Sequence, residues 1–377
     1  MGADMSMAGQ PAPQRQVFLD RLRTLLTVLV VAHHAAITYG AAGGWFYRER
    51  AADGSPASLL LTFFCAVNQA FFMGMFFLLA GYFTPGALQR KGPGRFLRER
   101  LVRLGVPVLV FGCLLGPLTV QLARGVDVAQ LQWHFFPARG WNFVMGPLWF
   151  CWALLLFSVA FVGCQLARVR VALKAMPSTM SWVVSALGVG LMAFVVRLVF
   201  PVGESLAGLQ LGYFVSYVFL FAMGCMAARQ QLLERVSRAQ ARWLMGLSLV
   251  SLPLLPMLLL LSRQMDMPET AYAGGANVLA LAYALWEPLV AWGIIASLLV
   301  MGREHLNQAS RAWTTLSENA YGAFVLHAPV LVLTSVAASS IAVPVLVKFA
   351  LVAATATVLS FSLSFVLRLS PTVRKVL

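Results

Sequence analysis

Long apolar runs alternate along this chain with short polar or basic segments. Ten such runs fall at about 22–40, 58–83, 104–123, 146–167, 180–200, 208–228, 243–261, 277–301, 320–339 and 343–367. A helix needs about 20 apolar residues to cross the hydrocarbon core of a bilayer, and each run has roughly that length. The pattern therefore predicts an all-α, polytopic integral membrane protein with about ten transmembrane helices.

The two ends of the chain differ from these runs. Residues 1–16 are polar and contain proline and glycine, which is typical of a flexible N-terminal tail. The apolar pattern continues to the last run, so we expect one membrane domain over 17–369. Residues 370–377 carry Arg374 and Lys375 and are expected to form a short C-terminal tail.

Basic residues gather in alternate connections between the runs. They precede the first run, lie between the second and third, and recur in every second connection up to Arg368, Arg374 and Lys375 at the carboxyl end. Cytoplasmic loops of membrane proteins carry such an excess of Lys and Arg. The alternation predicts that both termini are cytoplasmic, which requires an even number of spans and agrees with ten.

The amino-acid composition limits which binding partners are expected. Of 377 residues, 60% are hydrophobic and 11% are charged, whereas about 25% are charged in soluble domains. The net charge of +15 lies in short loops, so we expect membrane lipids as neighbours and no nucleic acid. The five cysteines form no CxxC pair and have no histidine at ligand spacing, so neither a metal site nor a disulfide framework is predicted.

Ionisable side chains inside the runs are the candidates for chemistry. Each costs about 2.5–3.5 kcal/mol to insert into a bilayer, so such a residue suggests a function. They are His33, His34, Arg197, Glu287, His327 and Lys348.

Arg23 and His34 share one face of the first predicted helix. They are eleven residues apart, which returns to within about 20° of the same face and separates them by about 16 Å along the axis. Asp20 precedes Arg23 on this face, whereas His33 points about 100° away. This pattern suits an anion contact at the cytoplasmic rim and a general base within the membrane. It also suits a snorkelling arginine with a histidine that bonds to a neighbouring helix.

The first helix resembles the opening of the acyltransferase 3 family of membrane acyltransferases. The segment FLDRLRTLLTVLVVAHHA (18–35) matches a Leu-Asp-x-x-Arg element with a histidine eleven residues after the arginine, and the match falls on Leu19, Asp20, Arg23 and His34. Four further segments resemble the family in order along the chain. They are FFMGMFFLLAGYFTP (71–85), RFLRERLVRLGVPVL (95–109), GPLWF (146–150) and YGAFVLHAPVLV (321–332).

The resemblance implies that 17–369 is an acyltransferase domain of a bacterial inner membrane. It would move an acyl group, such as acetyl or succinyl, from cytoplasmic acyl-CoA to a hydroxyl of a saccharide or lipid-linked glycan. Acyl-CoA is then a co-substrate, and no permanently bound cofactor is expected. The Arg-x-x-Arg element falls on Arg100 and Arg103. These residues and Arg98 are candidates for binding the CoA phosphates, although positive-inside charge also accounts for arginines there.

Several alternatives remain open at this stage. His34 is the expected catalytic residue, but the adjacent His33 leaves open which imidazole reacts, and transfer can proceed in one step or through an acyl-enzyme. His327 either lines the site or bonds to a neighbouring helix. Glu287 either contacts sugar hydroxyls or pairs with Arg197 or Lys348. A transporter that uses the same intramembrane groups is the alternative function, and the oligomeric state, acyl group and acceptor stay undetermined.

Overall fold

The computed structural model describes residues 17–125, 143–169, 172–264, 267–268 and 270–377, so the predicted tail 1–16 lies outside the described part. The described residues form helices joined by loops, and no β-strand occurs among them. The predicted all-α class is confirmed. The α-helices are α1 Val17–Thr38, α2 Pro56–Lys91, α3 Pro93–Arg100, α4 Val106–Val110, α5 Gly116–Ala123, α6 Trp149–Leu166, α7 Thr179–Arg197, α8 Phe214–Ala228, α9 Arg238–Ser251, α10 Leu254–Gln264, α11 Val278–His305, α12 Arg311–Ala337, α13 Val345–Leu367 and α14 Pro371–Val376.

Nine helical segments of the described chain are long and apolar enough to cross a membrane. They coincide with the second to tenth predicted runs, and α3–α5 and α9–α10 each count as one segment. The first predicted run corresponds to α1, which has 22 residues but contains Arg21, Arg23, His33 and His34. These polar groups lower the mean hydropathy of α1, so it is not among the nine segments. Within the bundle, α1 packs against α2, α12 and α13.

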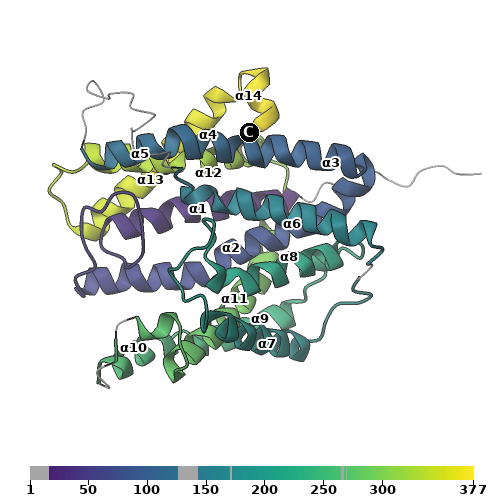
Figure 1. The fold of residues 1–377 in the computed structure, drawn as a ribbon, viewed down its shortest axis with the longest axis horizontal. Helices are drawn as coiled ribbons and strands as arrows, with labels where there is room; N and C mark the ends of the chain where they lie inside the picture. The colour runs from purple at the N-terminus through teal and green to yellow at the C-terminus, as the bar shows by residue number, and fades with distance from the viewer. Residues whose placement is uncertain (1–16, 126–142, 170–171, 265–266, 269) are drawn as a thin grey trace, which may run out of the picture.

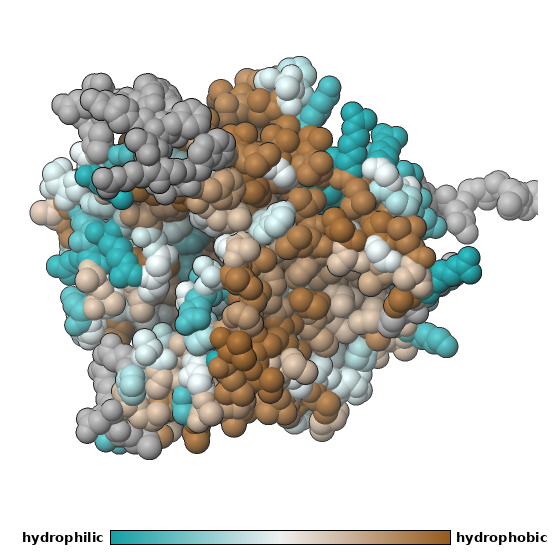
Figure 2. All heavy atoms as spheres, viewed as in Figure 1, coloured by the Kyte–Doolittle hydropathy of each residue, from teal (hydrophilic) through white to brown (hydrophobic). Residues whose placement is uncertain are grey.

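The long helices run side by side across the molecule (Figure 1). Figure 2 shows hydrophobic side chains across the middle of this face and hydrophilic ones toward its two ends, as expected where a bilayer surrounds the middle. We call the end with the first residues of α1 and α12 and the last of α2 and α13 the Arg100 end. The opposite end, with the loop 39–55, is the Trp45 end.

The segment Pro93–Ala123 is continuous but irregular. Two π-helical turns, Leu101–Gly105 and Phe111–Leu115, interrupt it. Pro107 lies four residues after Arg103, and a proline cannot donate the amide hydrogen that would bond to the carbonyl four residues earlier. A single π turn next to a proline is therefore physically reasonable, and such turns are frequent at functional sites.

Glycines let α2 and α8 approach closely. A Cβ on Gly81 would lie 2.1 Å from the carbonyl oxygen of Phe221, and one on Gly224 would lie 2.1 Å from that of Leu78. Small residues at such interfaces allow the van der Waals packing that associates helices in lipid. Any side chain at Gly81 or Gly224 would push the two helices apart.

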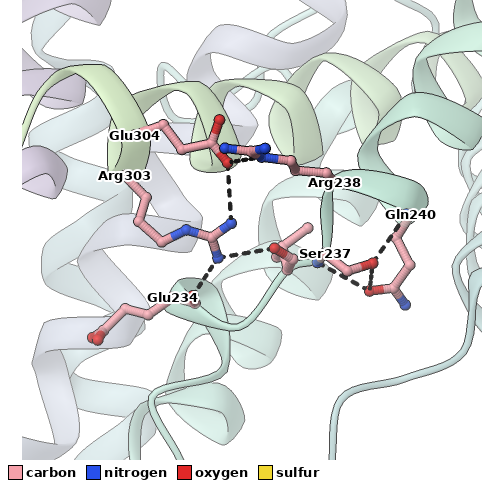
Figure 3. Close-up of polar contacts among 7 residues, drawn as sticks. Glu234, Ser237, Arg238, Gln240, Arg303 and Glu304 are labelled. Atoms are coloured by element: carbon pink, nitrogen blue, oxygen red, sulfur yellow. Dashed lines mark hydrogen bonds and ion pairs between the residues drawn. The ribbon is translucent and has the colours of Figure 1, made fainter.

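At the Arg100 end, the loop before α9 is bonded to the end of α11 (Figure 3). Arg303 Nη1 donates to the carbonyl oxygens of Glu234 at 2.5 Å and Val236 at 2.9 Å. Ser237 caps α9 in a reciprocal capping box with Gln240, which satisfies two otherwise unpaired amides. These bonds hold the turn between α8 and α9 against α11.

The predicted C-terminal tail is helical and packed. Residues Pro371–Val376 form α14. The side chain of Leu377 is buried and lies 3.5 Å from the position that a Cβ on Gly322 of α12 would take. The end of the chain therefore covers part of α12 at the Arg100 end.

Candidate active site

Two histidines from helices far apart in the sequence meet inside the bundle. His34 Nδ1 on α1 lies 3.1 Å from His327 Nε2 on α12, and the rings are nearly parallel, with centroids 5.1 Å apart. His327 Nδ1 lies 2.6 Å from the carbonyl oxygen of Phe324. His327 is fully buried, whereas His34 is intermediate in exposure.

The Phe324 carbonyl determines the tautomers of this pair. A carbonyl oxygen only accepts, so His327 Nδ1 carries the hydrogen and neutral His327 has its lone pair on Nε2. His327 Nε2 then accepts the hydrogen on His34 Nδ1. This chain of bonds leaves the lone pair of neutral His34 on Nε2, the nitrogen that can take a proton from a substrate.

Trp45, from the loop at the Trp45 end, covers the His34 ring. The indole and imidazole rings are stacked, with centroids 3.8 Å apart and an interplanar angle of 15°. Trp45 Nε1 is buried and makes no hydrogen bond with the described residues. An unpaired buried donor beside the imidazole is available to an oxygen of a bound molecule.

His33 has a different environment from His34. Its ring stacks on Phe72 of α2, with centroids 5.0 Å apart, and its Nδ1 has no partner among the described residues. It meets the His34 ring edge-on at 5.4 Å. His33 is thus a packing neighbour of the pair, in the direction that helical periodicity predicted.

Arginines gather at the Arg100 end, from α1 and from the segment Pro93–Ala123. Arg100 of α3 lies close enough to Arg23 and Arg103 for their charges to act on it. Arg100 Nη2 is 3.4 Å from Thr84 Oγ1, and its guanidinium lies over the Phe96 ring at 5.1 Å. We call Arg23, Arg100 and Arg103 the arginine cluster. Three like charges held together favour a multiply charged anion.

The charged residues of the Leu-Asp-x-x-Arg element have distinct contacts. Asp20 Oδ1 lies 3.4 Å from Arg23 Nη1 in a partly exposed ion pair. Arg21, in contrast, is buried and donates to the carbonyl oxygens of Leu306, at 2.7 Å, and Gln308. Arg21 therefore joins α1 to the loop before α12, whereas Arg23 is exposed at the rim.

Tyr321 connects the arginine cluster with the histidine pair. Its hydroxyl donates to the carbonyl oxygen of Arg103 and lies 3.6 Å from Cys151 Sγ. Tyr321 and His327 are on the same helix, α12, six residues apart. That separation is about 9 Å along the helix axis.

Of the three arginines predicted to bind the acyl donor, one lies apart from the arginine cluster. Arg98 is exposed on α3, and no contact joins it to the arginine cluster within the described part of the chain. Arg368, which follows α13, lies close enough to Arg103 for their charges to interact. Sequence reasoning did not select Arg368, since it reads as one more basic residue at the end of a span.

Glu287 belongs to a separate buried group toward the Trp45 end. Its Oε2 pairs with Arg197 Nη2, and Arg197 Nε donates to the Gly212 carbonyl oxygen at 3.0 Å. The Arg197 guanidinium also lies over the rings of Tyr213 and Tyr283. The contacts described for Glu287 do not include the histidine pair, so Glu287 acts as the partner of an intramembrane cation, one of the two predicted alternatives.

No group of three or more His, Cys, Asp or Glu side chains that could hold a metal ion occurs among the described residues. Sequence reasoning missed Trp45, because a tryptophan in an outer loop is usual at a membrane interface. Tyr321 was part of a quoted motif, but its partner Arg103 was not predictable from that motif.

Comparison with known proteins gives an independent result. The chain matches the family described as "Acyltransferase domain" over residues 16–369. It is 28% identical over 163 residues to the proteins named "Glucans biosynthesis protein C" from Salmonella schwarzengrund, Salmonella paratyphi B and Salmonella heidelberg. The match covers 42% of this chain and 40% of each relative. No solved structure matches the chain.

Proposed function

The chain belongs to the acyltransferase 3 family, whose domain spans residues 16–369, and from this premise we propose that it moves an acyl group from acyl-CoA to a saccharide hydroxyl. The name of these relatives, glucans biosynthesis protein C, supports a glucan as the acceptor. The observation that carries the proposal is the hydrogen-bonded chain from the Phe324 carbonyl through His327 to His34.

The arginine cluster is the proposed donor site. CoA carries phosphates, and guanidinium groups bind phosphate oxygens with paired hydrogen bonds. Arg23 and His34 are about 16 Å apart along α1, so a long thioester-bearing arm anchored at the rim can extend inward along this helix. We place the Arg100 end in the cytoplasm, since acyl-CoA is made there and the basic loops lie at that end.

His34 is the proposed general base. Its Nε2 takes the proton of the acceptor hydroxyl while the oxygen attacks the thioester carbonyl. The C–O bond forms, the C–S bond breaks, and the CoA thiolate leaves and receives the proton from His34. A two-step variant, in which His34 carries the acyl group between donor and acceptor, uses the same atoms.

Paired substitutions of the adjacent histidines test the base. His34→Gln should reduce acyl transfer to glucose oligomers by about 10²–10⁴-fold, the usual contribution of a general base. His33→Gln is the matched control and should retain most activity, because His33 packs on Phe72. Normal transfer by His34→Gln at equal expression would show that the base is wrongly assigned.

Donor binding separates this function from a transporter. Purified protein in detergent should bind a non-hydrolysable CoA thioester analogue, and Arg100→Gln should weaken binding. Arg95→Gln is the control, since Arg95 is 75% exposed on the same helix and pairs with Glu99. If the analogue does not bind, or binds equally to both variants, the proposed donor site is incorrect.

A further inference from the structure

A polar cavity of about 240 Å³ lies at the Trp45 end, beside but apart from the histidine pair. Its lining includes Tyr39, Glu49 and Arg50 from the segment after α1, and Ser339, Ala342 and Lys348 around the start of α13. The volume equals that of about eight waters at roughly 30 Å³ each. It therefore has room for one sugar ring, and its open side, where Arg50, Ser339 and Ala342 are exposed, leaves the rest of a glycan outside.

Two of the three charged residues of the cavity, Lys348 and Glu49, form an ion pair, and the third, Arg50, is exposed. Lys348 is 6% exposed, and its Nζ lies 2.5 Å from Glu49 Oε1 and 3.1 Å from the Ser339 carbonyl oxygen. Because Glu49 neutralises Lys348, this buried pair presents no net charge to a ligand. A neutral ligand with many hydroxyls can bond to the pair, and its oxygens can also accept from the exposed, solvated Arg50 guanidinium.

Two polar atoms of the cavity are incompletely bonded. Glu49 Oε2 is buried and has no hydrogen-bond partner among the described residues, and the buried Tyr39 hydroxyl interacts with Ser335 without forming a hydrogen bond of normal geometry. The carboxylate oxygen accepts and the phenol both donates and accepts. Buried polar groups in native proteins are nearly always satisfied, so these two await water or a ligand. Sugar hydroxyls, which donate and accept, match both.

The cavity is connected to the histidine pair by a short piece of chain. Tyr39 follows His34 by five residues, which is about 7.5 Å of helix rise. The same loop carries Trp45, which stacks on His34 at 3.8 Å, and Glu49 and Arg50, whose amides donate to the Thr38 carbonyl oxygen at 2.9 and 3.2 Å. A ring held in the cavity would thus contact the same loop that places Trp45 over His34.

We propose that this cavity is the subsite for a neutral sugar ring of the acceptor, with Glu49 and Tyr39 bonding to its hydroxyls. The inference rests on the proposed function, because it assigns the cavity to the acceptor of that reaction. The ring in the cavity anchors the glycan at the Trp45 end. A neighbouring residue of the same glycan then presents its hydroxyl to His34.

The first test measures binding without the donor. Ligand-observed NMR with the detergent-solubilised protein should detect contact with glucose oligomers. Tyr39→Phe removes one hydroxyl and should weaken binding about three- to tenfold, the value of one hydrogen bond. Tyr47→Phe is the matched control, because Tyr47 lies in the same loop but does not line the cavity.

The second test fills the cavity. Ala342 lines it and is exposed, so Ala342→Trp can occupy the volume with little risk to folding. It should raise KM for glucose oligomers more than tenfold and leave KM for the acyl donor unchanged. Ala350→Trp, on the exposed side of α13, should change neither value.

The outcomes separate the two proposals. If His34→Gln abolishes transfer but Tyr39→Phe and Ala342→Trp leave oligomer binding and KM unchanged, the acyltransferase proposal stands and the cavity holds only water. If no acyl transfer occurs at all, the proposed function fails. The binding measurement still shows whether the cavity binds a sugar. Loss of binding on Tyr47→Phe or Ala350→Trp would also overturn the assignment.

Discussion

The Tyr321 hydroxyl donates a hydrogen bond to the backbone carbonyl oxygen of Arg103, whose α-helical partner would be the amide hydrogen that Pro107 lacks. Arg103 lies in a π-helical turn, so the irregular turn and the tyrosine complement each other. The bond joins the helix segment that bears the arginine cluster to α12, which bears His327. The proposed donor site and the proposed base are thereby both joined to α12.

Tyr321→Phe tests this connection. Loss of the bond frees the Arg103 turn, so KM for the acyl donor should rise about fivefold, the value of about one hydrogen bond, while kcat changes little. Tyr82→Phe is the matched control, since it removes the 2.9 Å bond to Glu234, away from Arg103. Steady-state kinetics decide; equal KM values for the two variants would argue against a link between Tyr321 and the donor site.

His327 is predicted to act as a positioning residue for His34. His327→Phe removes the acceptor for His34 Nδ1 and should lower kcat about 100-fold, as expected when a general base is misoriented. His327→Gln keeps an acceptor oxygen near the position of Nε2 and should retain most of kcat. KM for both substrates should change little in either variant.

The pH dependence of kcat distinguishes a positioning role of His327 from a packing role, because loss of a residue that only packs would not shift it. His327→Phe should shift the acidic limb of the kcat profile, because His34 must be neutral to act as a base and its neighbour no longer sets its tautomer. An unshifted profile with equal loss in the Phe and Gln variants would mean that His327 only fills space.

The Arg197–Glu287 pair is predicted to stabilise the bundle. Arg197→Met leaves a buried carboxylate without its partner and should cost about 3–5 kcal/mol, whereas Arg197→Met/Glu287→Met removes both charges and should recover most of that loss. Unfolding of the solubilised protein in a denaturing detergent measures both. If the double variant is no more stable than the single one, charge pairing is not the source of the effect.

The contacts in Figure 3 predict unequal roles for two arginines. Arg303→Ala removes two charge-assisted bonds to backbone carbonyls and should cost about 1.5–3 kcal/mol. Arg238, whose side chain is 73% exposed, pairs with Glu304 in solvent, so Arg238→Ala should have a much smaller effect. The same denaturation experiment compares them, and equal losses would contradict this account of the α9–α11 turn.

Local pattern determined most of the architecture. The length of an apolar run is a property of neighbouring residues, so ten helices were placed from the sequence, including α12 and α13 with their short connection. Helical periodicity likewise put Arg23 and His34 on one face of α1 and turned His33 away. These predictions depend on no contact between distant segments.

Only the tertiary structure decided which groups meet. His34 and His327 are 293 residues apart, and Lys348 pairs with Glu49 of the loop 39–55, whereas the sequence also allowed Glu287 as its partner. Likewise, of the two arginines at the start of α1, Arg21 is buried and Arg23 is exposed. The physical reason is that lipid tails solvate every apolar helix face about equally well. Helix partners therefore depend on small residues and on a few polar bonds across the whole bundle. The sequence thus determined the helices and the depth of each polar group, and packing determined their partners.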